Sequence, residues 1–305
     1  MIVLLVLLLL VFSFVLIKSA DHVVIALRHL SKTTHAGVLA LSAILLALTS
    51  SFPELFIGIT SALQKTPSLS FGNVLGANIT NISLVAGLST FIVGRVNLSG
   101  GFVRHEIGIA LTAGILPLML AIDGSLGRID GFILIISYLI YVASFFKSRV
   151  SQIAEHHRKG NYITRFIRRI EHFESTTRKE LGRLFLAISV LLFSANAMVW
   201  VGRQIAIVAN LDIFLVGLII LSIGTTLPEL AFSIRALKDK EPTMFFGNLL
   251  GSVIANSTLI VGITSVITPI VIGAPQDYFV AGAFFVVTFL TFWFLVRSKL
   301  TLERW

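Results

Sequence analysis

Nine stretches of mostly apolar residues, each long enough to cross a bilayer, limit what this chain can fold into. A transmembrane helix needs about 20 such residues to span the hydrocarbon layer. Only 13% of the residues are charged, whereas about 25% are charged in a soluble domain, so a water-exposed surface could not be covered. The chain is therefore predicted to be an all-α integral membrane protein. The stretches lie near 2–30, 36–63, 69–94, 103–122, 128–146, 182–208, 211–237, 244–272 and 278–297.

The positive charges are concentrated between the fifth and sixth stretches. From Lys147 to Arg183, ten Lys/Arg and four Glu supply +6 of the net charge of +9. Basic loops stay on the cytoplasmic side, so we expect this loop inside the cell, the N-terminus outside, and the protein in the plasma membrane. No nucleic-acid partner is expected. The apolar residues from Ile163 to Phe173 follow helical spacing, which fits either a helix on anionic lipid or a solvated connector.

The sequence repeats itself. Residues 45–90 and 220–265 align without a gap at an offset of 175, with about a third of the positions identical, and Glu54 falls on Glu229. Repetitive apolar sequence would explain shared Leu and Ile, but not Pro-Glu and Gly-Asn at one constant offset. Because the first unit holds five stretches, an odd number, the second must enter the membrane in the opposite sense. This is the inverted-repeat architecture of secondary transporters.

The repeat predicts how the chain is organised. We expect a first transmembrane repeat over 1–146, a basic cytoplasmic loop over 147–181 and a second repeat over 182–305. The fifth stretch begins near Arg128, so its counterpart should begin near residue 303, yet the sequence ends at Trp305. Either the second half has four helices, or the tenth helix of two five-helix repeats is missing from this chain. We expect the latter.

Glu54 and Glu229 are the acidic residues flanked on both sides by apolar sequence. A carboxylate inside a bilayer costs at least a few kcal/mol, so it marks a functional site by default. Two acids at matching positions of inverted repeats should meet near the midplane. The structural alternative is a pair of protonated acids hydrogen-bonded to neighbouring helices.

Hydroxyl groups and prolines accompany each glutamate. Ser50 and Ser51 precede Glu54 by four and three residues, as Thr225 and Thr226 precede Glu229, so hydroxyl and carboxyl groups share a helix face. Pro53 and Pro228 are expected to break the helices and free backbone oxygens beside the carboxyl groups.

Asparagines line the next stretch of each half. For Asn81 and Asn256 we favour a role as ligands or in lining the site. Asn73 and Asn248 could serve in the same way or could equally hold neighbouring helices together. Gly72 and Gly76, matched by Gly247 and Gly251, predict a surface of small residues on which another helix approaches closely.

These residues offer only oxygen atoms, which suits hard cations such as Ca²⁺. Two glutamates neutralise one Ca²⁺, and several Na⁺ or protons could replace it. The chain has no cysteine and no nucleotide-binding motif, so we expect neither thiol chemistry nor an organic cofactor. An intramembrane enzyme using the two acids for acid/base catalysis would need a nucleophile or metal ligand nearby, and none is evident. A structural scaffold gives no reason for two matched acids.

Two doubled motifs carry a family resemblance. They are Ser-Ser-Phe-Pro-Glu-Leu (50–55) with Gly-Asn-Val-Leu-Gly-Ala-Asn-Ile-Thr-Asn (72–81), and Gly-Thr-Thr-Leu-Pro-Glu-Leu (224–230) with Gly-Asn-Leu-Leu-Gly-Ser-Val-Ile-Ala-Asn (247–256). They resemble the two α-repeats of the calcium/cation antiporter superfamily, in particular its prokaryotic Na⁺/Ca²⁺ exchangers. The resemblance implies ten helices and four cation positions between the second, third, seventh and eighth.

The resemblance also implies a role for each site residue. Glu54 and Glu229 would hold a central Ca²⁺, and Asn81 and Asn256 would line the middle. Ser50 and Thr225 would also bind Ca²⁺. One Na⁺ position would use Ser51 and the Ala47 carbonyl. The other would use Thr226, Ser252 and the Ser222 carbonyl.

Three positions depart from the family pattern. Thr49 replaces a usual Gly, and Ala77 lacks the hydroxyl of its counterpart Ser252, which weakens one implied Na⁺ position. Asn256 stands where some relatives carry Asp, which disfavours K⁺-dependent exchange. The sequence therefore predicts a monomeric antiporter, not an enzyme, that exchanges Ca²⁺ for Na⁺ by alternating access. H⁺/Ca²⁺ exchange is the alternative.

Overall fold

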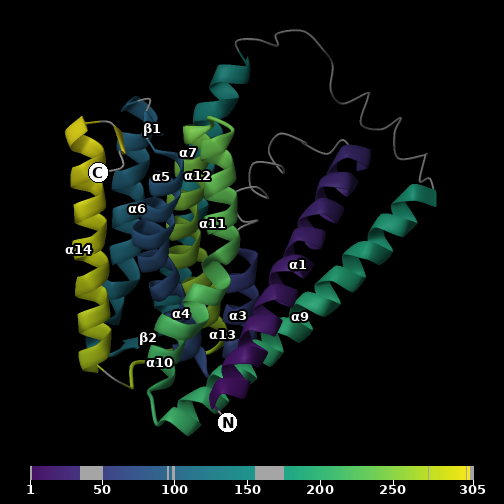
Figure 1. The fold of residues 1–305 in the computed structure, drawn as a ribbon, viewed down its shortest axis with the longest axis vertical. Coiled ribbons are helices and arrows are strands. Elements are labelled where there is room, and N and C mark those ends of the chain that lie inside the picture. The colour runs from purple at the N-terminus through teal and green to yellow at the C-terminus, as the bar shows by residue number, and fades with distance from the viewer. Residues whose placement is uncertain are drawn as a thin grey trace.

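The computed structural model describes residues 2–34, 51–94, 96–97, 100–154, 175–273, 275–299 and 301–302. Within these ranges the chain is a bundle of helices joined by short turns, as the sequence predicts (Figure 1). Two predicted site residues, Ala47 and Ser50, and most of loop 147–181 lie outside the described residues.

The helices follow the predicted stretches. The first half contains α1 (Ile2–Thr34), α3 (Phe52–Leu63), α4 (Pro67–Thr80), α5 (Ala86–Val93), α6 (Gly100–Leu120) and α7 (Arg128–Ala154). The second half contains α9 (Ser175–Ala209), α10 (Ile213–Leu215), α11 (Ser222–Lys238), α12 (Pro242–Ile254), α13 (Val261–Ile267) and α14 (Pro275–Lys299). Between them lie the π-helical segments η1 (Asn81–Val85), η3 (Val216–Leu221) and η4 (Ala255–Ile260), and the 3₁₀ turn η2 (Ala121–Asp123).

Seven helical segments of the described residues are long and apolar enough to cross a membrane. They are Ile2–Val23, Pro67–Val93, Glu106–Asp123, Gly182–Ala209, Ile213–Lys238, Pro242–Ile267 and Pro275–Val296. The helices α3 and α7 coincide with the described parts of the two remaining predicted stretches. Large apolar side chains such as Phe14, Ile140 and Phe294 lie on the outer surface, which suits contact with lipid. The chain is thus an all-α membrane protein.

Equivalent residues of the two halves form equivalent elements. The helix pairs α4 and α12, α5 and α13, and α6 and α14 each begin 175 positions apart. The turns before α4 and α12 also agree, because Lys65 and Lys240 both adopt a left-handed conformation, with φ of 57° and 60°. In each turn a proline occupies one of the first two positions of the following helix, where its missing N–H removes no helical hydrogen bond. The repeat seen in the sequence is therefore matched in the backbone.

Two short antiparallel ladders join the halves. Strand β1 (Val96–Asn97) pairs with β4 (Thr301–Leu302), and β2 (Ser125–Leu126) pairs with β3 (Ile270–Val271). The offset of 175 relates β1 to β3 and β2 to β4 within one residue, so the two ladders are equivalent. In Figure 1, β1 lies at the top of the bundle and β2 near the bottom. This placement at opposite ends supports the predicted inversion of the second repeat.

The helix irregularities differ from the prediction at one of the two prolines. In the first half, α3 begins at Phe52 with Pro53 in its first two positions, which is a normal helix start. In the second half the expected break at Pro228 is absent, because α11 continues through it from Ser222 to Lys238. Proline still removes the N–H that the Gly224 carbonyl would accept. The interruption lies before α11, in η3 (Val216–Leu221), and π-helical segments are frequent at functional sites.

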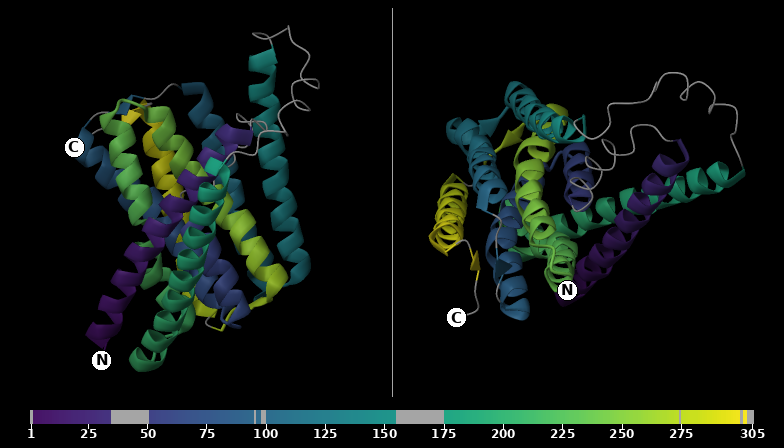
Figure 2. Two further views of the ribbon diagram at one scale, coloured as in Figure 1. Left: turned by 90° about the vertical axis from the view of Figure 1, so that its right-hand side faces the viewer. Right: turned by 90° about the horizontal axis from the view of Figure 1, so that it is seen from above.

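The apolar core forms two clusters. One joins α4–α7 to α11–α14 and is rich in aromatic residues such as Phe246, Phe285 and Phe289. The other is built mainly from α1 and α9, where Leu9 and Leu16 belong to the same cluster as Leu191 and other residues of α9. Figures 1 and 2 show α1 and α9 side by side and inclined to the remaining helices. The molecule thus consists of a large bundle and an inclined helix pair packed against it.

The predicted small-residue surface makes a close helix contact on α4 but not on α12, where a Cβ atom at Gly247 or Gly251 would meet no described atom within 4 Å. A Cβ atom at Gly72 would collide with the Phe214 carbonyl oxygen, and one at Gly76 with the Leu218 carbonyl oxygen. From the opposite side, a Cβ at Gly217 would collide with the Leu69 carbonyl oxygen. The backbones of α4 and η3 therefore touch, and this contact brings α4 beside the start of α11, where four of the predicted site residues lie.

Candidate functional site

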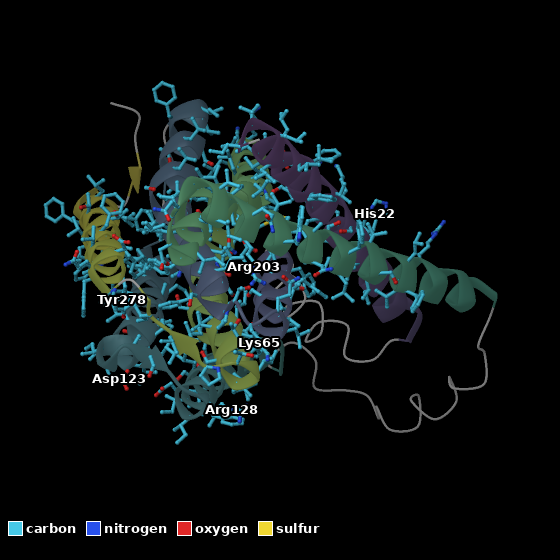
Figure 3. All side chains as sticks on the ribbon, turned by 90° about the horizontal axis from the view of Figure 1, so that it is seen from below. His22, Lys65, Asp123, Arg128, Arg203 and Tyr278 are labelled. Carbon is cyan, nitrogen blue, oxygen red and sulfur yellow. The ribbon has the colours of Figure 1, made fainter. Side chains whose placement is uncertain are left out.

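The nine predicted site residues that the structure describes are all in the interior, and none is more than 2% exposed. They lie on or beside five elements: Ser51 and Glu54 at the start of α3, Asn81 in η1, Ser222, Thr225, Thr226 and Glu229 on α11, Ser252 on α12 and Asn256 in η4. The charged residues labelled in Figure 3, among them Lys65, Arg128 and Arg203, are on the surface instead.

Glu54 and Glu229 are completely buried. They are neighbours, close enough for the charge of Glu54 to act on the Glu229 carboxyl group. Neither carboxyl oxygen of either residue has a hydrogen-bond partner within the described ranges. The alternative of two acids bonded to neighbouring helices thus finds no such bond there. Two ionised carboxylates in this position would cost several kcal/mol each without a compensating charge.

The start of α3 favours negative charge at Glu54. This residue lies in the first turn, immediately after Ser51 and Pro53. The first N–H groups of a helix lack helical partners and carry a partial positive charge. Glu229 lies inside α11, beyond the first turn of that helix. The two acids are therefore equivalent in sequence and differ in their backbone environment.

Thr225 connects the two halves of the site. Its hydroxyl donates to Asn73 Oδ1 at 3.3 Å and to the Ser222 carbonyl at 3.2 Å, and it lies beside the Glu54 carboxyl group. Asn73 thereby acts in holding helices together, one of the two roles left open for it. The counterpart of Thr225 is Ser50, which is not among the described residues.

Thr226 bonds to its own helix. Its hydroxyl donates to the Ser222 carbonyl at 2.9 Å, so this carbonyl accepts from both threonines. In the first half, the Ser51 hydroxyl is buried without a partner in the described part of the chain. Ser252 is also fully buried. The hydroxyl groups of the site thus lie inside the bundle, and those of Thr225 and Thr226 converge on one backbone oxygen.

Asn81 and Asn256 occur at the beginning of π-helical segments, η1 and η4. Neither polar atom of the Asn81 amide has a hydrogen-bond partner among the described residues. Asn256 donates from Nδ2 to Asn78 Oδ1 at 3.2 Å, and its Oδ1 has no described partner. Both residues therefore carry buried amide oxygens that are not used by the fold described here.

Asn78 and Glu106 are two of the buried polar residues that the sequence pattern did not single out. Asn78 on α4 contacts Asn256, and the signal was weak because Val253 stands at its counterpart position. Glu106 on α6 is a third buried acid, 7% exposed, and accepts a hydrogen bond from Tyr141 at 3.1 Å. It lies at the end of an apolar stretch, next to Arg104 and His105 in sequence, where an acid would normally be solvated.

The donor atoms define the chemistry of this site. The described residues contain no group of three or more His, Cys, Asp or Glu that could hold a metal ion. The predicted site residues offer carboxyl, hydroxyl and amide oxygens instead. Such ligands suit Ca²⁺, and other hard cations, better than the softer transition metals.

Comparison with known proteins shows which family the sequence matches. A family model described as sodium/calcium exchanger protein matches residues 4–147 and 179–305. The putative antiporter CaxA of Alkalimonas amylolytica is 28% identical over 265 residues, which cover 85% of this chain and 79% of that protein. The inner membrane protein YrbG of Escherichia coli (strain K12) is 27% identical over 276 residues, covering 86% and 79%.

A solved structure has the same fold. The sodium-calcium exchanger NCX_Mj, soaked with 10 mM Na⁺ and 10 mM Sr²⁺, superposes with a TM-score of 0.61. The match covers 100% of this chain and 94% of that one, at 23% sequence identity. The fold described above is therefore that of a known ion transporter.

Proposed function

The chain belongs to the sodium/calcium exchanger family, and from that premise we propose that it is a secondary active antiporter exchanging Ca²⁺ for Na⁺ across the membrane. Both ions compete for one all-oxygen site at the midplane, built around Glu54 and Glu229. The family and the fold are those of a transporter. Transport moves ions without chemical conversion, so no residue is assigned a catalytic role.

The observation that carries this proposal is the buried glutamate pair. Both carboxyl groups are inaccessible, and none of their oxygens has a partner in the described part of the chain. Buried charges in proteins are normally paired or bind a metal ion. A divalent cation between the two carboxylates would neutralise both. Ca²⁺ accepts six to eight oxygen ligands in flexible geometry, which the surrounding hydroxyl and amide groups help to supply.

We assign the Ca²⁺ ligands on this basis. Glu54 and Glu229 bind the ion from two sides, and the hydroxyls of Ser50 and Thr225 complete the central position. Thr225 already lies beside Glu54, which supports its inclusion. The amide oxygens of Asn81 and Asn256 line the same space.

The Na⁺ positions lie on either side. One uses Ser51 and the Ala47 carbonyl, and the other uses Thr226, Ser252 and the Ser222 carbonyl. The hydroxyls of Thr225 and Thr226 donate to the Ser222 carbonyl. A hydroxyl that donates one hydrogen bond keeps two lone pairs, so these threonine oxygens can turn toward a cation. Because Na⁺ and Ca²⁺ share the glutamates, they exclude each other, which is what antiport requires.

Alternating access follows from the two packing units. The pair α1 and α9 slides over the bundle that carries the site, and α1 contacts α11 at Gly224, next to Thr225 in sequence. A Cβ atom at Gly224 would lie 2.5 Å from Ser13 Oγ of α1. The N-terminus lies outside and loop 147–181 inside, as Lys and Arg counting predicts, in the plasma membrane. The protein works as a monomer, and the loop either binds anionic lipid or is a plain connector.

Proton-coupled exchange is the competing function. The glutamate pair alone could carry protons in place of Na⁺. Protons need only the carboxyl groups, so the oxygens assigned to the two flanking positions, such as those of Ser51 and Thr226, would have no ion to bind in that case. Those oxygens therefore favour Na⁺.

Transport measurements on the purified protein test the proposal. In proteoliposomes, ⁴⁵Ca²⁺ uptake should follow an outward Na⁺ gradient and be negligible with K⁺ gradients. Glu54→Gln and Glu229→Gln should each abolish it, since one remaining carboxylate leaves half the ion's charge uncompensated. Glu106→Gln is the matched control, because Glu106 is also a buried acid but its neighbour is Tyr141.

The outcomes separate the alternatives. Uptake driven equally well by protons and indifferent to Na⁺ would replace Na⁺ coupling by proton coupling. Ca²⁺ transport retained by both glutamine variants would refute the site. A loss of transport in Glu106→Gln equal to that in Glu54→Gln would show that any buried acid is needed and would remove the assignment to the pair.

A further inference from the structure

The two halves of the site differ in how their asparagines are held. Asn81 and Asn256 occupy equivalent positions, and both are completely buried. Asn256 has a hydrogen-bonded neighbour, Asn78, whereas the residue equivalent to Asn78 in the second half is Val253. A valine side chain has no polar atom, so no equivalent bond to Asn81 can form.

Asn78 is part of a chain of three side chains. Its Nδ2 donates to Ser257 Oγ at 2.7 Å, and its Oδ1 accepts from Asn256 Nδ2 at 3.2 Å. Asn78 and Ser257 are each 1% exposed, so water does not compete for these bonds. Ser257 follows Asn256 directly in η4. One amide on α4 thus holds two consecutive residues of the π-helical segment.

The direction of these hydrogen bonds decides which atom of the Asn256 amide is left without a partner. With its Nδ2 bound to Asn78, Asn256 has its Oδ1 without a described partner. If the Asn256 amide turned over, its oxygen would face the oxygen of Asn78, and two acceptors repel. Relief would require Asn78 to turn as well and Ser257 to become the donor. The alternative arrangement therefore needs three side chains to change together.

We propose that Asn78 is a positioning residue that fixes the Asn256 amide so that its oxygen, and not its NH₂ group, is presented to the transported cation. The inference rests on the proposed function, in which Asn256 lines the ion site. An NH₂ group in the same place would repel the ion. Asn81 lacks such a holder, so the amide of the second half is the pre-organised one, and pre-organised ligands bind with less loss of freedom.

The test uses the valine found in the equivalent position. Asn78→Val should raise the KM for Ca²⁺ in proteoliposomes about fivefold to tenfold, the range expected for one lost hydrogen bond, with kcat within twofold of wild type. Asn256→Ala should raise KM similarly, and the double variant Asn78→Val/Asn256→Ala should raise it no further. A residue that acts only through Asn256 must show this non-additivity.

Controls separate positioning from general damage to the fold. Ser70→Ala removes another buried side-chain hydrogen bond of α4, to Thr264 at 3.4 Å, and should leave the KM unchanged. Ser257→Ala should raise KM in the same direction as Asn78→Val, but less, because it loosens Asn78 without removing it. If Asn78→Val fails to fold, Ser257→Ala and its double variant with Asn256→Ala carry the same test.

The failure of this inference is distinct from that of the proposed function. Calorimetric titration of the purified wild-type protein with CaCl₂ is performed beside transport. Wild-type protein that neither binds nor transports Ca²⁺ would overturn both proposals. Wild-type transport with an unchanged KM in Asn78→Val, or with an added loss in the double variant, would overturn only the role of Asn78.

Discussion

At the scale of single residues, the oxygens of the site differ in whether they already take part in a hydrogen bond. Thr226 is bonded to a carbonyl of its own helix at 2.9 Å, and Thr225 is shared between Asn73 and that same carbonyl. The carboxyl oxygens of Glu54 and Glu229 have no partner in the described ranges. The fold has thus given these two hydroxyls partners, whereas the carboxyl oxygens, the Ser51 hydroxyl and the Asn81 amide have none among the described residues.

The first half of the site has an alanine where the second half has a serine hydroxyl, and restoring this hydroxyl should strengthen Na⁺ binding. Ala77 is fully buried on α4 and is the counterpart of Ser252 on α12. Ala77→Ser adds an oxygen ligand to the half of the site that lacks one, at the cost of one extra atom in the core. The Na⁺ concentration that half-inhibits Ca²⁺ uptake should fall about threefold to tenfold, a gain of roughly 1 kcal/mol in Na⁺ binding.

The control for this gain lies on another helix. Ala113→Ser on α6 introduces the same atom at a buried position of the aromatic cluster and should leave Na⁺ inhibition as in the wild type. If Ala77→Ser behaves like Ala113→Ser, position 77 does not face a Na⁺ position, and the implied correspondence with Ser252 is wrong.

The buried acids and amides differ in how far their positions can be predicted from the sequence. Glu54 and Glu229 could be found because a charged residue in an apolar stretch is rare and costly. Asn78 could not be found by comparing the two halves, since its counterpart is the apolar Val253 and no repeated pattern marks it. Glu106 was missed because burial at the end of a helix depends on its neighbour Tyr141, 35 positions away, and spacing does not reveal that contact.

At the scale of elements, local backbone chemistry explains both what the sequence predicts and where it errs. The turns before α4 and α12 are predictable, since Pro67 and Pro242 fit the first positions of a helix. Pro228 was expected to break α11, but the helix absorbs it. The interruption moves to η3, where the helix meets α4. A proline specifies which hydrogen bond is lost, whereas packing decides where the backbone adjusts.

The close contact between α4 and η3 should make the stability of the protein sensitive to an added methyl group at Gly76. Gly76→Ala places a Cβ against the Leu218 carbonyl and 2.6 Å from Ser222 Oγ. Neither backbone can move without shifting the start of α11. Overpacking of this kind costs about 1–3 kcal/mol, so the thermal unfolding temperature of the purified protein should fall.

A glycine of α5 provides the comparison. Gly87 is exposed, and a Cβ there meets no described atom within 4 Å. Alanine favours a helix by about 1 kcal/mol relative to glycine, so Gly87→Ala should unfold at the same temperature as the wild type or higher. Equal stability of Gly76→Ala and Gly87→Ala would show that α4 and η3 do not pack backbone to backbone.

At the scale of the whole molecule, apolar residues of α3, α4 and η3 pack against the helix pair in one cluster. Ser13 of α1 lies 3.8 Å from Met198 of α9, inside the pair. Between the units, Gln64 at the end of α3 donates to Asn196 of α9. Apolar packing is non-directional, so it allows sliding, and the hydrogen bond between Gln64 and Asn196 can be remade in each state. Transport should therefore require the Gln64–Asn196 contact to open.

This requirement can be tested by cross-linking, because the chain has no cysteine of its own. In the variant Gln64→Cys/Asn196→Cys, a short bifunctional thiosulfonate should join α3 to α9 and reduce Na⁺-driven Ca²⁺ uptake at least tenfold, and reducing agent should restore it. Ser68→Cys/Val271→Cys is the matched pair, since Ser68 Oγ lies 2.9 Å from the Val271 carbonyl and both residues belong to the bundle. Its cross-link should leave uptake intact. Full transport by the cross-linked Gln64→Cys/Asn196→Cys protein would mean that α9 does not move relative to α3 during the cycle.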